Sequence, residues 1–367
     1  MKILEPKNRS FFHVEWETTL KCNLDCKYCS GHDNSLDHPS LEDSLKTVDF
    51  IFEYVNLYMK TYPDDNPYVM KHVNIDLHGG ETMFHPNIVE ILEYAREKRH
   101  YYTDFNANVS TITNAVVGKN LWKKISSLID YFTVSYHAES LPKQQQMMRD
   151  NILHLKEKGK DFHVSVMMHP HYWDNCMEMV EWCQQNSIPY NPRQIDRSWL
   201  MWNWNYSSDQ ASFLSGGGCS PDDSKSIFDK LKQTVKGGID MSSQGRTCCG
   251  GVPFYVDEDY STTQKFVDNK FKGWQCSVNR FFLFIRQTTG EIFTNKDCRH
   301  NLDSKVAPLG YLNNTQPIID ELKYYVEKNE IPTITCQKKS CWCGMCAPKA
   351  TDSDAFARIM KKYTSHI

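Results

Sequence analysis

The chain has 367 residues, of which 40% are hydrophobic and 24% charged, a composition that excludes disordered and fibrous proteins. Its formal net charge is −3, and Lys and Arg are dispersed among Asp and Glu, which argues against nucleic acid or an anionic membrane as a partner. No apolar run approaches the roughly 18 residues of a spanning helix, and residues 1–9 lack the apolar core of a signal peptide, so we expect a cytoplasmic protein.

Short apolar or alternating segments alternate with longer helix-like segments between residues 12 and 193, which predicts strand–helix units. The predicted strands are His13–Leu20, His72–His78, Asn108–Thr113, Tyr131–Tyr136, His163–Met168 and Ile188–Arg193. The predicted helices are Leu41–Lys60, Pro86–Arg99, Lys119–Ile129, Pro142–Lys158 and Trp173–Asn186, with Ser40 as the N-cap of the first. Such units predict an α/β fold, a partial (β/α)6 TIM-like barrel whose reactive site lies at the carboxyl ends of the strands.

The rest of the chain changes character after this region. We expect the barrel over residues 1–195, an aromatic and Gly-rich linker over 196–250, and a smaller C-terminal α+β domain over 251–367. In the last part, Asn279–Arg286 and Glu291–Thr294 predict a hairpin, and Pro317–Asn329 predicts a helix.

Three of the 14 cysteines, Cys22, Cys26 and Cys29, form a Cys-x3-Cys-x2-Cys loop directly after the first predicted strand. Clustered cysteines in a chain without an export signal indicate metal binding more often than disulfides. Thiolates favour iron–sulfur clusters, zinc or Cu(I), and three ligands on a four-iron cluster leave one iron open to a cofactor. A structural zinc loop is the alternative, with His32 or His38 as the fourth ligand.

This loop resembles that of the radical S-adenosylmethionine (SAM) superfamily, in which an aromatic residue precedes the third cysteine, as Tyr28 does here. The resemblance implies a [4Fe–4S] cluster on the three cysteines, SAM chelated by its open iron, and Tyr28 near the adenine. It also implies an external electron donor such as flavodoxin or ferredoxin.

Gly79, Gly80 and Glu81 follow the second predicted strand and resemble the superfamily's Gly-Gly-Glu motif, which binds the amino group of SAM. Glycines let a backbone approach a ligand closely, and a carboxylate can pair with an ammonium group. An isolated Gly-Gly-Glu is otherwise an ordinary turn, so its place after a strand favours the functional interpretation.

The next strand ends carry further candidates for cofactor binding. Asn114 resembles the middle of a Thr-Asn-Gly motif in which Ala115 replaces the glycine, and Ser135 resembles the serine of a Ser-x-Asp-Gly motif that contacts SAM. Arg193 ends the sixth strand and either pairs with a carboxylate of SAM or substrate or is a surface arginine.

His137 and Glu139 are candidate catalytic residues because they lie at a barrel strand end, where a histidine can act as a general base. A histidine with a structural role is the alternative. Cys176 and Cys183 lie seven residues apart on one predicted helix, and we interpret them as core thiols.

The C-terminal cysteines follow a second pattern. One cysteine precedes the predicted hairpin, one follows it, and a Cys-x2-Cys pair closes the set, an order that resembles the twitch domain, the shorter relative of the SPASM domain. The resemblance implies an auxiliary [4Fe–4S] cluster, for which a four-thiolate zinc site is the alternative. Its ligands would be Cys276, Cys298, Cys343 and Cys346.

Apart from the two core thiols, five cysteines remain outside both sets, and a second auxiliary cluster is one interpretation of them. Cys248 and Cys249 lie beside Gly250 and Gly251 and are also candidate hydrogen donors at the barrel mouth. The other three are Cys219, Cys336 and Cys341.

Taken together, the resemblance implies reductive cleavage of SAM to a 5′-deoxyadenosyl radical that abstracts hydrogen from a small molecule or peptide, with oxidation, epimerisation or cross-linking as outcomes. The first predicted strand starts near residue 12, which favours a small molecule or a peptide bound without a leader-binding domain. The competing hypothesis is a zinc-stabilised binding protein without catalysis.

Overall fold

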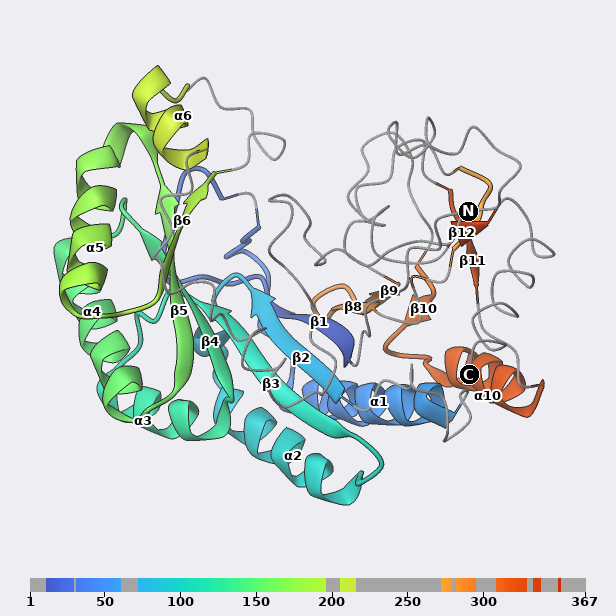
Figure 1. Cartoon of the computed structure of the whole chain (residues 1–367). Helices are drawn as coiled ribbons and strands as arrows, with labels where there is room; N and C mark the ends of the chain where they lie inside the picture. Colours follow the sequence, from blue (N-terminus) through green and yellow to red (C-terminus); the bar gives the residue numbers. More distant parts are fainter. Residues whose placement is uncertain are drawn as a thin grey trace.

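Six parallel strands, paired in sequential order, form the larger part of a nine-stranded sheet (Figure 1). The structure, a computed structural model, describes residues 11–29, 31–60, 72–195, 205–215, 272–276, 278, 282–294, 308–328, 333–337 and 349–350. The six strands are β1 (Phe11–Thr19), β2 (His72–Gly79), β3 (Asn106–Thr113), β4 (Tyr131–His137), β5 (Asp161–Met168) and β6 (Tyr190–Gln194). They confirm the predicted partial barrel, and every predicted strand end lies within two residues of the observed one.

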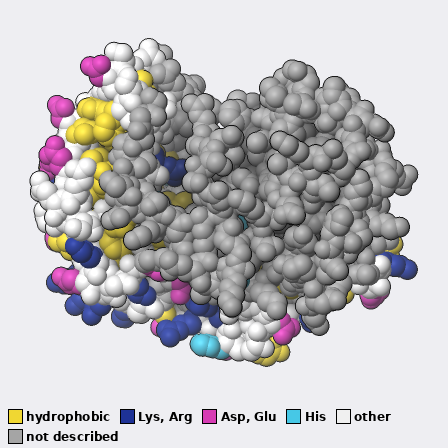
Figure 2. Space-filling view, viewed as in Figure 1, with side chains coloured by type: hydrophobic (Ala, Val, Ile, Leu, Met, Phe, Trp, Pro, Cys, Tyr) yellow, Lys and Arg dark blue, Asp and Glu magenta, His cyan; other side chains and the backbone are white. Residues whose placement is uncertain are grey.

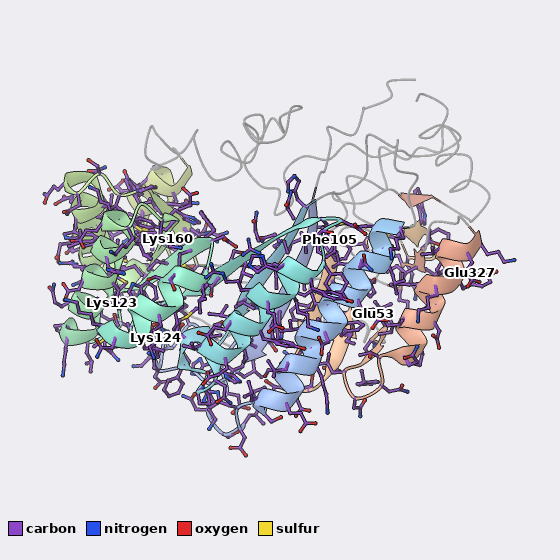
Figure 3. All side chains as sticks on the ribbon, turned by 90° about the horizontal axis from the view of Figure 1, so that it is seen from below. Glu53, Phe105, Lys123, Lys124, Lys160 and Glu327 are labelled. Carbon is purple, nitrogen blue, oxygen red and sulfur yellow. The ribbon has the colours of Figure 1, made fainter. Side chains whose placement is uncertain are left out.

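Helices follow the strands and cover one face of the sheet (Figures 1 and 3). They are α1 (Leu41–Lys60), α2 (Ile88–Tyr101), α3 (Lys119–Leu128), α4 (Pro142–Glu157) and α5 (Trp173–Gln185), with the short 3-10 helices η1 (Thr82–Phe84) and η2 (Pro170–Tyr172) between them. Ser40 caps α1 as predicted, because its hydroxyl accepts a hydrogen bond from Asp43 N at 3.1 Å.

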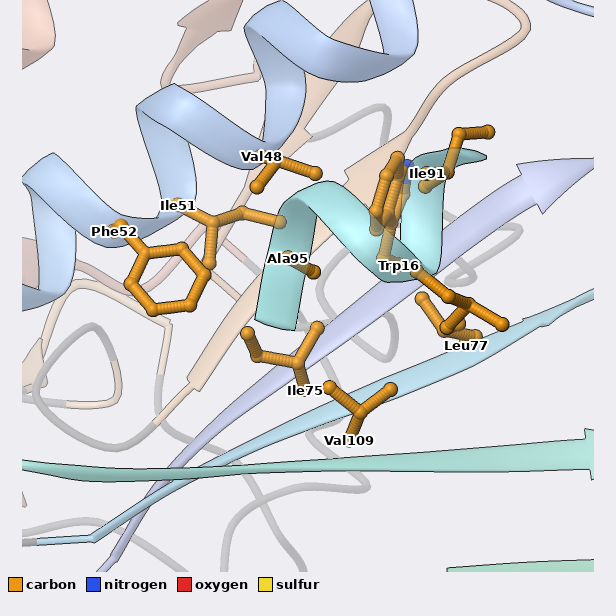
Figure 4. A pocket seen from close by; sticks show the side chains of 10 residues that line it. Trp16, Val48, Ile51, Phe52, Ile75, Leu77, Ile91, Ala95 and Val109 are labelled. Carbon is orange, nitrogen blue, oxygen red and sulfur yellow. The ribbon is translucent and has the colours of Figure 1, made fainter. Parts of the chain in front are cut away.

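Alternation along the strands sorts the side chains between the two faces. On β1, Phe12, Val14 and Trp16 are at most 1% exposed and belong to the core against the helices. Between β1–β3 and the first two helices a small cavity remains (Figure 4). Its lining is entirely apolar, and includes Trp16 and Ile51, so we regard it as a packing defect of the core.

The C-terminal part of the chain continues the same sheet beyond β1 (Figure 1). β8 (Phe282–Arg286) pairs in parallel with β1, and β9 (Glu291–Phe293) and β10 (Gly310–Tyr311) follow in antiparallel pairing. The predicted hairpin is thereby confirmed. α10 (Gln316–Lys328) confirms the predicted helix and lies beside α1 on the outer face (Figure 3).

A second, three-stranded antiparallel sheet contains β7 (Gln275–Cys276), β11 (Ile334–Thr335) and β12 (Lys349–Ala350). A helix, α6 (Ser208–Ser215), lies within the segment expected to be a linker. The division into domains at residues 195 and 250 stays a prediction.

Figure 2 shows Lys and Arg mixed with Asp and Glu along the lower edge of the described surface. None of the helices in the described part of the chain combines the length and apolar character that crossing a bilayer requires.

Candidate functional site

The three cysteines of the first loop follow β1 at the carboxyl edge of the sheet. Cys26 is buried, Cys22 is partly buried and Cys29 is exposed. Burial, with smaller contributions from the charges of Glu81 and Cys29, raises the pKa of the Cys22 thiol to about 11. Burial also raises the pKa of Cys26 far above its usual range, with added contributions from Glu139 and the other two cysteines. The thiols therefore lie near one another in surroundings that disfavour free thiolates, and a bound cationic centre would relieve this cost.

The donor set fits an iron–sulfur cluster by its chemistry. Three thiolates on one loop are the ligands such a cluster takes, and each would bind a different iron. Among the described residues, no three His, Cys, Asp or Glu side chains converge as ligands of one metal ion. Cys22 Sγ also accepts a hydrogen bond from Leu24 N at 3.4 Å, a contact of the kind that tunes a thiolate ligand.

Gly79 and Gly80 hold the start of this loop against the end of β2. Gly80 N donates to Thr19 O, and Glu81 N donates to Lys21 O, each at 2.8 Å. A Cβ atom added to Gly79 would lie 2.1 Å from Thr19 O, and one added to Gly80 would lie 2.3 Å from Lys21 O. Gly79 also has φ of 136°, which favours glycine. The two glycines are thus required by the cysteine loop itself, a role that the sequence analysis did not identify.

The Glu81 carboxylate joins the ends of β2 and β3. It is 1% exposed, and it accepts hydrogen bonds from Met83 N at 3.0 Å, Thr113 Oγ1 at 2.7 Å and Asn114 N at 2.6 Å. Burial raises the pKa of Glu81, while these three hydrogen bonds lower it. Both carboxylate oxygens are engaged within the protein, so Glu81 orders the strand ends around the cysteine loop.

Asn114 links β3 to the cysteine loop. Its side-chain amide donates to Asn23 Oδ1 at 2.8 Å and lies 3.9 Å from Cys22 Sγ, while its Oδ1 accepts from Val116 N at 2.9 Å. Ala115 follows with φ of 53°, in the left-handed region that favours glycine. The turn after β3 is therefore formed with alanine where the Thr-Asn-Gly motif has glycine.

His137, Glu139 and Tyr28 meet at the ends of β4 and β5. The Tyr28 hydroxyl hydrogen-bonds His137 Nδ1, and the two rings stack with centroids 5.9 Å apart. His169, which the sequence analysis did not single out, lies 5.8 Å from the Tyr28 ring, and its Nε2 lies 3.9 Å from Glu139 Oε1. Burial lowers the pKa of both histidines to about 4, so both rings are neutral near pH 7.

Ser135 and Arg193 lie on the face of the sheet opposite the helices. Ser135 pairs with Ser165 across β4 and β5, on the same face as His137, and Arg193 is opposite Met167 across β5 and β6. Burial, with a smaller contribution from the charge of Arg193, lowers the pKa of His163 to about 4.

Polar side chains line the same face on β1–β3. Ser110 Oγ donates to Asp76 Oδ1 at 2.7 Å, and Asn74 Nδ2 donates to Ser110 Oγ at 3.0 Å. His13 Nδ1 lies 3.3 Å from Asn74 Nδ2. Closed barrels fill this space with branched apolar side chains, so a polar face here suits a polar ligand.

The C-terminal cysteine set is only partly within the described residues. Cys276 lies buried on β7, and Cys336 lies buried just after β11, its backbone hydrogen-bonded to Trp274 O at 2.7 Å. Cys336 was not among the predicted ligands. It directly follows β11, the strand that pairs with β7. The cysteines outside the described ranges are Cys219, Cys248, Cys249, Cys298, Cys341, Cys343 and Cys346.

Cys176 and Cys183 are 0% exposed on α5. Burial raises the pKa of Cys176 to about 11 and that of Cys183 to about 12. They are core thiols, as predicted.

Solved structures share this fold over nearly the whole chain. anSMEcpe with bound AdoMet has a TM-score of 0.50 and 12% identity, covering 97% of this chain and 96% of that chain. Streptococcus suis SuiB bound to its precursor peptide SuiA has a TM-score of 0.50 and 13% identity, covering 92% of this chain and 71% of that chain. No family model matches the sequence, and no curated protein matches it. These neighbours are radical SAM enzymes, and this chain shares their fold.

Proposed function

We propose that the protein is a radical SAM enzyme. The observation that carries this proposal is the position of the Cys22–Cys29 loop at the end of β1, in a fold shared with radical SAM enzymes. Gly79 and Gly80 contact the backbone at the start of that loop so closely that a Cβ atom on either would clash with it. When bound, the [4Fe–4S] cluster would supply the electron that cleaves SAM into methionine and a 5′-deoxyadenosyl radical able to abstract hydrogen.

The chain's own residues would bind and order the cofactors. Cys22, Cys26 and Cys29 would hold the cluster. SAM would lie along the strand ends that carry Gly79, Gly80, Asn114 and Ser135, with Tyr28 beside the adenine. Glu81 would support this edge through its three internal hydrogen bonds, and a direct contact between Glu81 and SAM stays a prediction.

An auxiliary [4Fe–4S] cluster on Cys276, Cys298, Cys343 and Cys346 is part of the proposal. The buried position of Cys276 on a short antiparallel sheet supports it, because burial and backbone pairing suit a fixed ligand. A flavodoxin or ferredoxin would serve as electron donor.

We propose a peptide or a polar small molecule as the substrate. Two neighbours were solved with peptides: SuiB with SuiA, and anSMEcpe with the Kp18Cys peptide, at a TM-score of 0.50 and 13% identity for the latter. The hydrogen-bonded polar face around Asn74, Asp76 and Ser110 supports a polar substrate, since an apolar one would leave these groups unsolvated.

The test is the metal content and SAM chemistry of anaerobically purified full-length protein. We expect roughly eight iron and eight sulfide atoms per chain if both clusters are present, and 5′-deoxyadenosine after dithionite reduction with SAM. Replacing Cys22, Cys26 and Cys29 together by Ala should remove about half the iron and all 5′-deoxyadenosine.

Cys183→Ala is the matched control, because it removes a thiol from the core and should leave the iron content and the yield of 5′-deoxyadenosine unchanged. Zinc without sulfide in the wild type would establish the zinc-stabilised binding protein instead.

A further inference from the structure

A tight turn after β4 directs Glu139 toward the cysteine loop. Ser140 N and Ser140 Oγ both donate to His137 O, at 3.0 Å and 2.6 Å. Gln145 Nε2 on α4 donates to Ser140 O at 2.9 Å and so ties the turn to the next helix. The turn that carries Glu139 is therefore fixed by its own hydrogen bonds.

The Glu139 carboxylate reaches the segment between the second and third cysteines. Its Oε2 accepts a hydrogen bond from Lys27 N at 3.0 Å, and its Oε1 lies 3.9 Å from His169 Nε2. The Glu139 side chain is 11% exposed and that of His169 is 2% exposed, whereas Lys27 is exposed to solvent. A hydrogen bond from a backbone N–H to a carboxylate is charge-assisted and stronger than one between neutral groups.

The same segment is held at its next residue. Tyr28 contacts His137 at the end of β4 and His169 after β5. The first part of the loop is held separately by the end of β2, through Glu81 N and Lys21 O. Each half of the cysteine loop thus has its own support from the sheet edge.

We propose that Glu139 is a positioning residue that fixes the Lys27–Tyr28 segment, and with it Cys26 and Cys29, by accepting the hydrogen bond from Lys27 N. It acts through the loop and not on the substrate, in contrast to the catalytic role first expected of it. This inference rests on the proposed function, because its expected consequence is that a displaced loop would misplace the open iron and Tyr28 relative to SAM.

The first test uses hydrogen–deuterium exchange of the full-length protein prepared without metal, read by mass spectrometry on peptides that contain Lys27. Glu139→Ala removes the acceptor, and exchange in this segment should become at least about tenfold faster. Glu139→Gln keeps an acceptor oxygen without the charge, and exchange should stay within about threefold of the wild type. Glu178→Ala, which removes an exposed carboxylate from α5, should change nothing there.

Unchanged exchange in Glu139→Ala, or equally fast exchange in Glu139→Gln, would overturn the proposal. If Glu139→Ala also speeds amide exchange in α4 and α5, that variant has disturbed more than the loop. The comparison of Glu139→Gln with the wild type then decides.

The second test uses the reconstituted protein and follows SAM binding by the EPR signal of the reduced cluster. Glu139→Ala should retain iron and bind SAM at least about tenfold more weakly, and Glu139→Gln should restore the affinity to within about threefold. Wild-type affinity in Glu139→Ala would show that the contact has no bearing on the cofactor and would overturn the proposed role. A wild type that binds neither cluster nor SAM would refute the proposed function, while the exchange experiment would still decide whether Glu139 holds the loop.

Discussion

Glu81 joins two strand ends through a carboxylate that solvent hardly reaches. Three donors converge on its two oxygens, one from η1 and two from the end of β3. A buried donor that loses its acceptor costs about 1–3 kcal/mol, so the stability of this edge depends on one side chain.

Glu81→Ala should therefore lower the free energy of unfolding by about 3 kcal/mol or more, as measured by urea denaturation followed by circular dichroism. Glu81→Gln keeps one acceptor oxygen and should lose roughly half as much. Glu93→Ala on the exposed side of α2 is the control, with a change within about 0.5 kcal/mol. Wild-type stability in Glu81→Ala would contradict the hydrogen-bond arrangement described for this residue.

The sequence predicted which residues gather at this edge better than it predicted what they contact. Gly79 and Gly80 were expected to face a ligand, whereas their tightest contacts are backbone atoms of Thr19 and Lys21, about 60 positions away in the chain. His169 carried no motif, and only the fold brings it beside Tyr28. Such contacts depend on strand register, which local patterns do not specify.

At the scale of elements, the prediction was close because one face of strands such as β2 and β4 is polar, so that buried residues alternate along them and differ from the helical period. The turn after β3 needed more than periodicity. Ala115 has φ of 53° there, and the side-chain amide of Asn151 on α4 donates to Ala115 O at 2.9 Å and to Val117 O at 2.8 Å. The buried Asn151 thus holds a turn that glycine would adopt with less strain.

Asn151→Ala should lower the free energy of unfolding by about 2–4 kcal/mol, because two buried carbonyl groups would lose their donor. Asp150→Ala changes the exposed neighbour on the same helix and should stay within about 0.5 kcal/mol of the wild type. Urea denaturation of the three proteins measures both changes. Equal stability of the two variants would show that the Asn151 amide does not support the turn.

At the scale of the whole molecule, the C-terminal part shares the barrel's sheet. The hairpin was predicted, yet its pairing with β1 was not, because a strand's partner is set by distant hydrogen bonds. One signal was present: Phe282–Ile285 is a continuous apolar run, typical of a strand buried on both faces. The junction is reinforced by Trp16 Nε1, which donates to Gln287 Oε1 at 2.9 Å, and by an ion pair between Arg286 Nε and Glu17 Oε1 at 2.6 Å.

Arg286→Gln should lower the free energy of unfolding by about 3 kcal/mol, because the Glu17 side chain is only 7% exposed and would lose the cation that lies 2.6 Å from its carboxylate. Adding Glu17→Gln should recover part of the loss, since two neutral amides can hydrogen-bond each other without a buried charge. Glu178→Gln breaks the pair with Arg149, in which Glu178 is 61% exposed, and should cost less than about 1 kcal/mol. The measurement is urea unfolding followed by both tryptophan fluorescence and circular dichroism. Coincident transitions are expected because β8 is part of the barrel's sheet. A double variant less stable than Arg286→Gln would contradict the assignment of the loss to the broken ion pair.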